Sequence, residues 1–172
     1  TAMRSRVMEL CALIRGRKPD LTWSCMTRAD LVDPELLAAM RGAGCVSVAF
    51  GVDGASDGAC GVMGKGFDTG RARAAVAAAR AAGIETRGYY IFGYPGETPE
   101  TVRETMELAR SLSPSYGYHI LAPFPGTEVR DKAAEYGIRI LTSDWDLYDA
   151  NRSVSESVSM PASEVDRIVN EF

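Results

Sequence analysis

The residues best suited to binding a ligand come directly after short apolar segments of the chain. Asp53 follows one such segment, and its carboxylate could accept two hydrogen bonds from a ribose diol, although an Asx-turn would equally explain it. Lys65 lies between two glycines and could pair with a ligand carboxylate or phosphate, or remain a solvated loop residue. Arg28 could form a similar ion pair, or a surface salt bridge with Asp30 or Asp33. These three side chains are therefore candidates for holding a polar ligand.

The segment 93–98, GYPGET, predicts a tight turn from a strand into a helix. Its Gly93 could let the backbone approach a flat ligand that stacks near the ring of Phe92. The structural alternative is a plain loop in which Thr98 caps the next helix. His119 lies in the middle of an apolar segment, so we expect it in the core or lining a barrel rather than in catalysis. The sequence names no catalytic residue.

The cysteines do not form a metal-binding motif. None of them lies within four residues of another, which excludes a CxxC motif and a tight three-cysteine iron–sulfur loop. A single histidine also excludes a multi-histidine metal site. We therefore predict no metal site, and reduced, mostly buried thiols at Cys11, Cys25, Cys45 and Cys60.

An alternating pattern of strands and helices must position these candidate residues. The expected strands cover 21–25, 45–52, 86–92 and 116–122, and the expected helices 4–15, 34–42, 71–82, 99–112 and 163–172. This alternation predicts an α/β fold with a four-stranded parallel sheet and crossover helices, plus a C-terminal helical appendage. Parallel-strand enzymes bind ligands at the carboxyl ends of their strands, which is where the candidate residues lie.

Composition excludes several classes of function. The chain of 172 residues is one domain's worth, and 46% of it is hydrophobic, which is enough for a packed core. The net charge of -4 argues against a general nucleic-acid binder, and no apolar run is long enough to span a membrane. Because the sequence starts without an apolar signal segment, we expect a cytoplasmic protein. A polar, serine-rich change near the end predicts a division into residues 1–130 and an extension, 131–172.

Seven short segments, taken in order, resemble the radical S-adenosylmethionine (SAM) superfamily. They are most similar to the branch whose members often carry a cobalamin-binding domain upstream. No single segment identifies the family, but seven segments in the same order are specific to it. The likeness runs from about residue 21 to residue 148. The segments are 23–30, 40–45, 50–53, 63–67, 82–84, 92–98 and 123–127, and the tail at 144–149 is similar too.

The resemblance implies a partial (β/α) TIM-like barrel that contacts SAM. It places Asp53 at the SAM ribose, where a Glu is commoner in the family, Lys65 at the SAM carboxylate and Arg28 near the methionine moiety. The segments implied to contact the adenine contribute Phe92, Gly93, Pro123 and Phe124. The implied cofactors of the intact protein are SAM, a 4Fe-4S cluster and, in the cobalamin-binding branch, cobalamin.

The cluster loop of the family, CxxxCxxC, is absent from this sequence. The resemblance therefore implies the C-terminal part of a radical SAM domain, without the first two strands of the barrel. Such a chain would not cleave SAM by itself, because a cluster needs three closely placed thiolates. In the intact enzyme, reductive cleavage of SAM would yield a 5′-deoxyadenosyl radical that serves methyl transfer or oxidative cyclisation of a small-molecule substrate.

Two other functions stay open. One is a non-catalytic half-barrel that serves binding or assembly. The other is a different βα-barrel enzyme, such as a hydrolase or aldolase, although the single histidine and the lack of a Schiff-base lysine on a strand count against it. An open four-stranded sheet has two unpaired edges, so we expect self-association, and neither nucleic acid nor a membrane as a partner.

Overall fold

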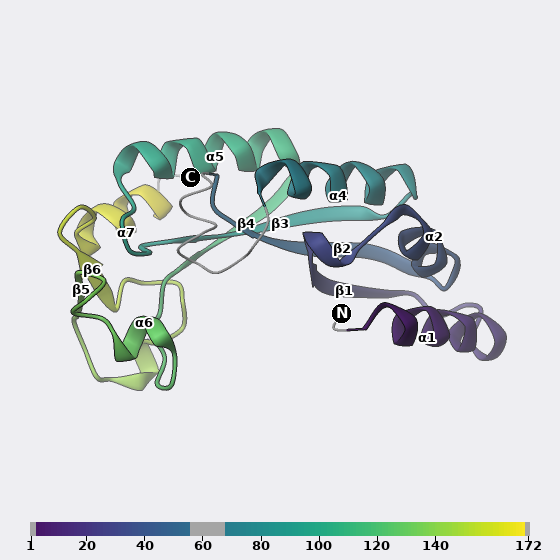
Figure 1. Cartoon of the computed structure of the whole chain (residues 1–172), viewed down its shortest axis with the longest axis horizontal. Helices are drawn as coiled ribbons and strands as arrows, with labels where there is room; N and C mark the ends of the chain where they lie inside the picture. The colour runs from purple at the N-terminus through teal and green to yellow at the C-terminus, as the bar shows by residue number, and fades with distance from the viewer. Residues whose placement is uncertain (1–2, 56–67, 171–172) are drawn as a thin grey trace. The chain divides into compact units, whose positions relative to one another are not determined.

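The computed structural model of this chain describes residues 3–55 and 68–170. Strands and helices alternate in the predicted order (Figure 1). The helices are α1 (Arg4–Arg17), α2 (Pro34–Gly42), α4 (Thr69–Ala81), α5 (Pro99–Leu112), α6 (Glu128–Asp131) and α7 (Ala162–Asn170). The strands are β1 (Trp23–Arg28), β2 (Cys45–Asp53), β3 (Glu85–Phe92), β4 (Ser115–Ile120), β5 (Ile138–Ile140) and β6 (Ser155–Ser157). Within these described ranges, no helix is both long and apolar enough to cross a membrane.

The central sheet contains four strands in the order β1-β2-β3-β4 (Figure 1). Strands β1 and β2 pair in parallel, with Thr27 opposite Phe50 and Arg28 opposite Gly51. Strands β5 and β6 form a separate antiparallel pair. The predicted α/β fold with a four-stranded parallel sheet and crossover helices is confirmed.

Local sequence signals set the helix starts. The carboxylate of Asp33 accepts a hydrogen bond of 2.8 Å from the Leu36 N–H, as expected for the cap of α2. Helix α4 begins slightly earlier than predicted, because Asp68 accepts a 2.8 Å hydrogen bond from the Arg71 N–H and so provides the cap.

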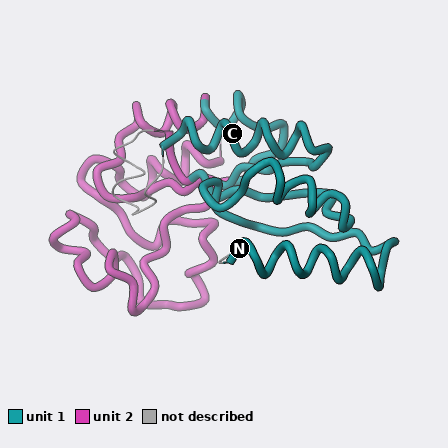
Figure 2. Tube along the Cα trace, turned by 45° about the vertical axis from the view of Figure 1, so that its right-hand side comes forward, with its two compact units in different colours: residues 1–52, 67–89, 108–117 teal, residues 53–66, 90–107, 118–172 magenta. Residues whose placement is uncertain are grey.

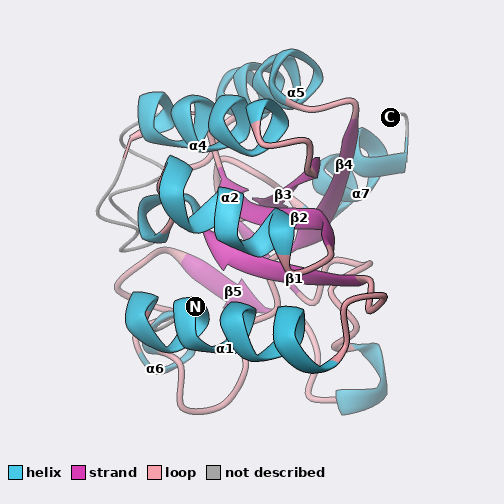
Figure 3. Ribbon diagram, turned by 90° about the vertical axis from the view of Figure 1, so that its right-hand side faces the viewer, coloured by secondary structure: helices cyan, strands magenta, loops and turns pink. Residues whose placement is uncertain are grey.

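The chain forms two compact units (Figure 2). Unit 1 consists of residues 1–52, 67–89 and 108–117, and unit 2 of residues 53–66, 90–107 and 118–172. In unit 1, α1 runs beside α2 (Figure 3), and α2 buries Leu36, Leu37 and Met40 completely. Each unit combines segments that are distant from one another in the sequence. The predicted boundary after residue 130 stays a prediction.

The C-terminal helix α7 belongs to the core of unit 2. Its Val165 and Ile168 pack with Phe92 and Ile120, because an apolar stripe at this spacing faces one side of a helix. The Ile120 N–H also donates a 2.8 Å hydrogen bond to the Ala150 carbonyl. The predicted C-terminal helical appendage is therefore present, and it partly covers β4, one of the two edges expected to be open.

Candidate cofactor site

Asp53 ends β2 in a backbone conformation that is unusual for a residue with a side chain. Its φ is +68°, in the left-handed region, and its side chain is buried. Such conformations cost free energy and cluster at functional sites, and Asp tolerates them better than most residues. The loop that follows is held in unit 2, where the Ala55 N–H donates to Thr105 Oγ1 at 3.0 Å. The predicted ligand role of Asp53 is compatible with this strained and fixed position.

The turn after β3 requires glycine for its backbone conformation. Gly93 and Gly96 have φ values of +84° and +79°. A Cβ atom at Gly93 would lie 3.8 Å from the side chains of Ile120 and Leu121, which is ordinary van der Waals contact within the chain. The positive φ is therefore one physical reason for glycine at this position, and the approach of a flat ligand to Gly93 stays a prediction.

Glu97 is the polar group of this turn that the sequence analysis did not single out. Its side chain is fully buried, and its Oε2 accepts a hydrogen bond from the Gly93 N–H. Its Oε1 is buried and makes no hydrogen bond within the described residues. Burial raises the pKa of Glu97 to about 8, although the Gly93 N–H acts in the opposite direction. The carboxyl is therefore mostly protonated at neutral pH, and one of its oxygens is a buried polar atom without a hydrogen-bond partner in the described residues.

The ring of Phe92 is part of the core of unit 2. It is buried, and its centroid lies 5.0 Å from that of Tyr118. A flat ligand needs an exposed ring face for stacking, so the expectation that a ligand stacks near Phe92 has to be corrected. Phe92 instead fixes the strand end through its carbonyl, which accepts a 2.8 Å hydrogen bond from the Leu121 N–H.

The loop after β4 carries an exposed aromatic ring. Pro123 is buried, whereas Phe124 is exposed. The Pro123 carbonyl accepts a hydrogen bond of 3.2 Å from Arg130 Nη1, which also donates to the Tyr148 hydroxyl at 2.6 Å. No role was predicted for Arg130, and Tyr148 was noted only as part of the tail that resembles the family. No local spacing in the sequence connects either residue to this loop.

Of the two remaining predicted cofactor residues, Arg28 lies within the described part of the chain. Arg28 lies in unit 1 and donates through Nε and Nη2 to the two carboxylate oxygens of Asp30, each at 2.9 Å. The Arg28 guanidinium lowers the pKa of Asp30, so the surface salt bridge foreseen as the alternative is formed. Lys65 lies outside the described residues. Unit 2 contains the other predicted positions, namely Asp53, Phe92, Gly93, Pro123 and Phe124.

His119 and the cysteines are the other side chains for which the sequence supported an expectation. His119 is exposed, so the expectation of a core position is wrong, whereas a barrel-lining position stays open. Cys25 and Cys45 lie on neighbouring strands, and the interaction of their side chains lowers the pKa of Cys25 to about 7 and raises that of Cys45. The Cys45 thiol donates a hydrogen bond to the Ser47 carbonyl at 3.5 Å. Cys11 is a buried free thiol, as predicted, and Cys60 lies outside the described residues.

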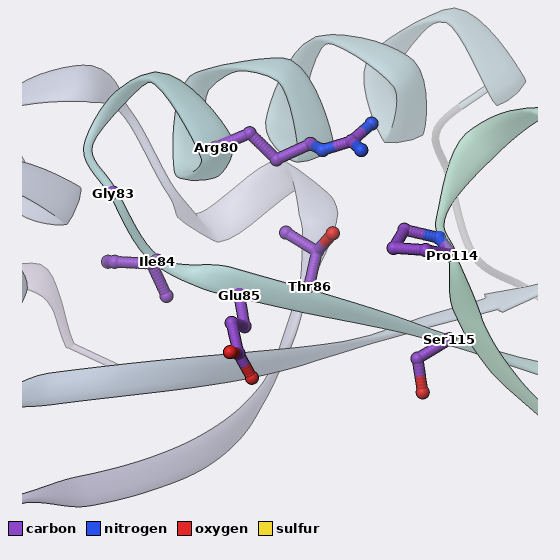
Figure 4. Close-up of a pocket in the computed structure, with 7 residues that line it drawn as sticks. All are labelled: Arg80, Gly83, Ile84, Glu85, Thr86, Pro114 and Ser115. Carbon is purple, nitrogen blue, oxygen red and sulfur yellow. The ribbon is translucent and has the colours of Figure 1, made fainter.

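A hollow of about 420 Å³ lies in unit 1 (Figure 4). It is located at the amino ends of β3 and β4, whereas the predicted ligand residues follow carboxyl ends. The lining residues are Arg80, Gly83, Ile84, Glu85, Thr86, Pro114 and Ser115. It contains none of the predicted site residues and is not the candidate cofactor site.

Comparison with known families decides the broader class. Residues 1–109 match the family described as the Radical SAM superfamily, which is more than half of the chain. The chain belongs to the radical SAM superfamily. The family resemblance seen in the sequence motifs is thereby confirmed.

Named relatives of this radical SAM chain include a methyltransferase and a cyclase. An uncharacterized methyltransferase of Pyrococcus horikoshii is 30% identical over 149 residues, covering 86% of this chain and 32% of the relative. An anaerobic magnesium-protoporphyrin IX monomethyl ester cyclase of Rubrivivax gelatinosus is 26% identical over 176 residues, covering 100% of this chain and 31% of the relative. The chain thus spans about a third of the length of these relatives.

Solved structures share the fold of this radical SAM chain. The methyltransferase TsrM from Kitasatospora setae, with tryptophan substrate and a SAM analogue, matches with a TM-score of 0.66 and 23% identity, over 96% of this chain and 34% of that one. The coproporphyrinogen III oxidase HemN from Escherichia coli matches with a TM-score of 0.63 and 18% identity, over 83% of this chain and 39% of that one. At these identities the likeness supports the TIM-like barrel fold alone.

The residues present fit one of the family's cofactors and not the other. Within the described residues, no three His, Cys, Asp or Glu side chains are placed to hold a metal ion, so this part of the chain does not fit a 4Fe-4S cluster. Two features of unit 2 do fit SAM: the buried, strained Asp53 and the unpaired, buried Oε1 of Glu97. Asp53 is an acidic group at the carboxyl end of a strand, where parallel-sheet proteins bind ligands, and Glu97 Oε1 is a buried polar atom that a ligand could satisfy.

Proposed function

We propose that this chain supplies the nucleoside-binding part of a radical SAM domain in a longer protein that catalyses methyl transfer or oxidative cyclisation. In that protein the 4Fe-4S cluster is held by residues outside this chain, and cobalamin is a further cofactor. The observation that carries the proposal is the left-handed, buried Asp53 at the carboxyl end of β2 in a radical SAM chain. The relatives named as a methyltransferase and a cyclase support the reaction class.

Asp53 is suited to a ribose because its backbone is held at the carboxyl end of β2. Its own φ of +68° and the hydrogen bond from Ala55 to Thr105 fix the start of the following loop. A carboxylate on a fixed backbone can accept hydrogen bonds from both hydroxyls of a diol, and less backbone entropy is then lost when the ligand binds. Asp53 would then orient the ligand, whereas SAM and the cluster supply the radical chemistry when they are bound.

Glu97 would assist from the turn after β3. Its protonated carboxyl holds the turn through the Gly93 N–H and leaves Oε1 buried and unpaired. A buried unpaired oxygen costs free energy, and a ligand hydrogen bond would remove that cost. We therefore expect Glu97 to contribute to binding as a neutral group rather than as an anion.

Calorimetric titration with SAM tests the proposal in the intact protein with its cluster. Asp53→Asn keeps the size of the side chain and its tolerance of positive φ, so we expect unchanged thermal stability and roughly tenfold weaker SAM binding. Asp20→Asn, in an exposed position, is the matched control and should bind SAM normally. If both variants bind SAM with equal affinity, Asp53 is not part of the SAM site.

A non-catalytic half-barrel module is the second candidate, because no described group of side chains can hold a metal ion. Iron–sulfur reconstitution distinguishes the two proposed functions. The chain alone should take up no stoichiometric cluster. The intact protein should gain a 4Fe-4S spectrum and, when a one-electron reductant is supplied, cleave SAM reductively. Cluster-free behaviour of the intact protein would favour the binding module, and a complete cluster on the chain alone would refute our assignment.

A further inference from the structure

Three aromatic side chains of unit 2 meet beside the loop that follows β4, and we call Phe124, Trp145 and Tyr148 the aromatic cluster. The ring centroids of Phe124 and Tyr148 are 5.7 Å apart, and those of Trp145 and Tyr148 are 4.7 Å apart. Tyr148 is buried, whereas Phe124 is 46% exposed and Trp145 is 51% exposed. Two large rings therefore flank a buried one and keep about half of their surface open.

Hydrogen bonds hold Tyr148 at the centre of the aromatic cluster. Arg130 Nη1 donates to the Tyr148 hydroxyl at 2.6 Å and to the Pro123 carbonyl at 3.2 Å. The Tyr148 hydroxyl in turn donates to the Thr142 carbonyl at 2.9 Å. The guanidinium carbon of Arg130 lies 5.3 Å from the Trp145 ring centroid and 5.8 Å from that of Tyr148, within cation–π range. Tyr148 and Arg130 are thus positioned before any ligand arrives, which lowers the entropy cost of binding.

Phe124 and Trp145 are more exposed than a purely structural role would require. A structural anchor would turn its large rings inward, since burying an aromatic side chain is favourable by a few kcal/mol. Here Phe124 and Trp145 pack on Tyr148 and stay about half exposed. Within the described residues the hydrogen bonds of Arg130 use Nη1, so Nε and Nη2 keep unused donors. A guanidinium edge beside open aromatic faces is complementary to a carboxylate carried on a flat ring.

We propose that the aromatic cluster and Arg130 bind a planar aromatic carboxylate. The ring of the ligand stacks on Phe124 and Trp145, and its carboxylate pairs with Nε and Nη2 of Arg130. The proposal does not rest on the proposed function, because ring stacking and this ion pair need neither SAM nor a cluster. It goes beyond the adenine contact implied for Phe124, since Trp145, Tyr148 and Arg130 had no assigned part in that contact.

Titration of the chain with 2-naphthoate, followed by NMR, provides the test. The chain has two tryptophans, so Trp23→Phe leaves the indole N–H signal of Trp145 as a single reporter. We expect saturable shifts of that signal with 2-naphthoate. Cyclohexanecarboxylate, which lacks the flat ring, and 2-naphthalenemethanol, which lacks the charge, should each bind at least tenfold more weakly. Equal binding of either compound would overturn the proposal.

Calorimetry of variants assigns the binding to named residues. Phe124→Ala and Trp145→Ala should each weaken 2-naphthoate binding about tenfold, and Arg130→Lys, which keeps the charge and loses the two-pronged geometry, should do the same. Tyr136→Ala is the matched control, because Tyr136 is an exposed aromatic outside the cluster. Wild-type affinity in Arg130→Lys or Trp145→Ala would refute the site. A second result would also refute the site: 5′-deoxyadenosine displaces the probe, and Trp145→Ala leaves the affinity for the probe unchanged. Phe124 would then belong to a nucleoside site.

Discussion

At the scale of single residues, Glu97 shows how burial alone changes the chemistry of a side chain. A carboxyl ordinarily ionises well below pH 7, but this one has lost its water, and one backbone N–H does not replace it. The protonated form is therefore favoured in the folded state. In the unfolded chain Glu97 returns to an ordinary pKa, so the folded chain binds one more proton over the interval between the two pKa values.

This proton uptake predicts a stability that falls as the pH rises. The contribution of Glu97 is fully present below its ordinary pKa of 4.5 and is lost progressively up to its folded pKa of about 8. The loss is at most about 5 kcal/mol, because one pKa unit corresponds to about 1.4 kcal/mol. Chemical denaturation of Glu97→Gln between pH 5 and pH 8 should lack this part of the decline, and profiles that run parallel to the wild type would disprove the assignment.

A second prediction at residue scale concerns Cys25. The neighbouring Cys45 side chain lowers the pKa of Cys25 to about 7, so alkylation of Cys25 by iodoacetamide should reach half its maximal rate near pH 7. In Cys45→Ala that neighbour is lost, and the midpoint should move upward to about 8.5. Cys11→Ala serves as the control and should leave the midpoint in place. Peptide mass spectrometry measures each site, and an unmoved midpoint in Cys45→Ala would contradict the thiol pair.

At the scale of the elements, Asp33 connects two helices of unit 1. It caps α2 through the Leu36 N–H, and it accepts a hydrogen bond of 2.8 Å from Arg4 Nε in α1. Arg4 also pairs with Glu35 in the first turn of α2. The capping bond satisfies a backbone donor that has no other intrahelical partner, whereas the ion pair is exposed and screened by water.

These two interactions should differ in their effect on stability. Asp33→Ala removes the cap and the pair, and should lower the free energy of unfolding by about 1 to 2 kcal/mol. Arg4→Ala removes only the exposed pairs and should lower the free energy of unfolding by less than Asp33→Ala does. Urea denaturation of both variants measures the difference. A larger loss in Arg4→Ala than in Asp33→Ala would mean that the ion pairs, and not the cap, stabilise α2.

At the scale of the whole molecule, the two sheet edges differ. At β4 the Ile120 N–H is already paired with the Ala150 carbonyl, which limits pairing with another chain there. Strand β1 is the other edge of the sheet, and its Met26 is 62% exposed. An edge strand with an exposed apolar side chain is a template for pairing between copies.

The chain alone should therefore self-associate through β1. Met26→Lys places a charge on that edge and should shift the sedimentation equilibrium at least tenfold toward the monomer. Val158→Lys is the control, since Val158 is 97% exposed in unit 2, and it should associate as the wild type does. A wild-type chain that stays monomeric at high concentration would rule out this use of the edge.

What the sequence could determine were features that depend on near neighbours. The order of strands and helices, the Asp33 cap of α2 and the need for glycine at position 93 each follow from a few adjacent residues. The family motifs likewise lie in short segments, and the match to residues 1–109 agrees with them. The energies of caps and turns are local, so a linear pattern contains them.

Only the tertiary structure decided which distant side chains meet. Glu97 is a candidate binding group because the surrounding core excludes water, and no spacing in the sequence indicates that burial. The contact of Arg130 with Tyr148 joins residues 18 apart, and Cys25 reaches Cys45 only because β1 pairs with β2. Burial and cross-chain contacts are set by the packing of the folded chain, which is why the candidate ligand surface at Phe124 and Trp145 became visible only in three dimensions.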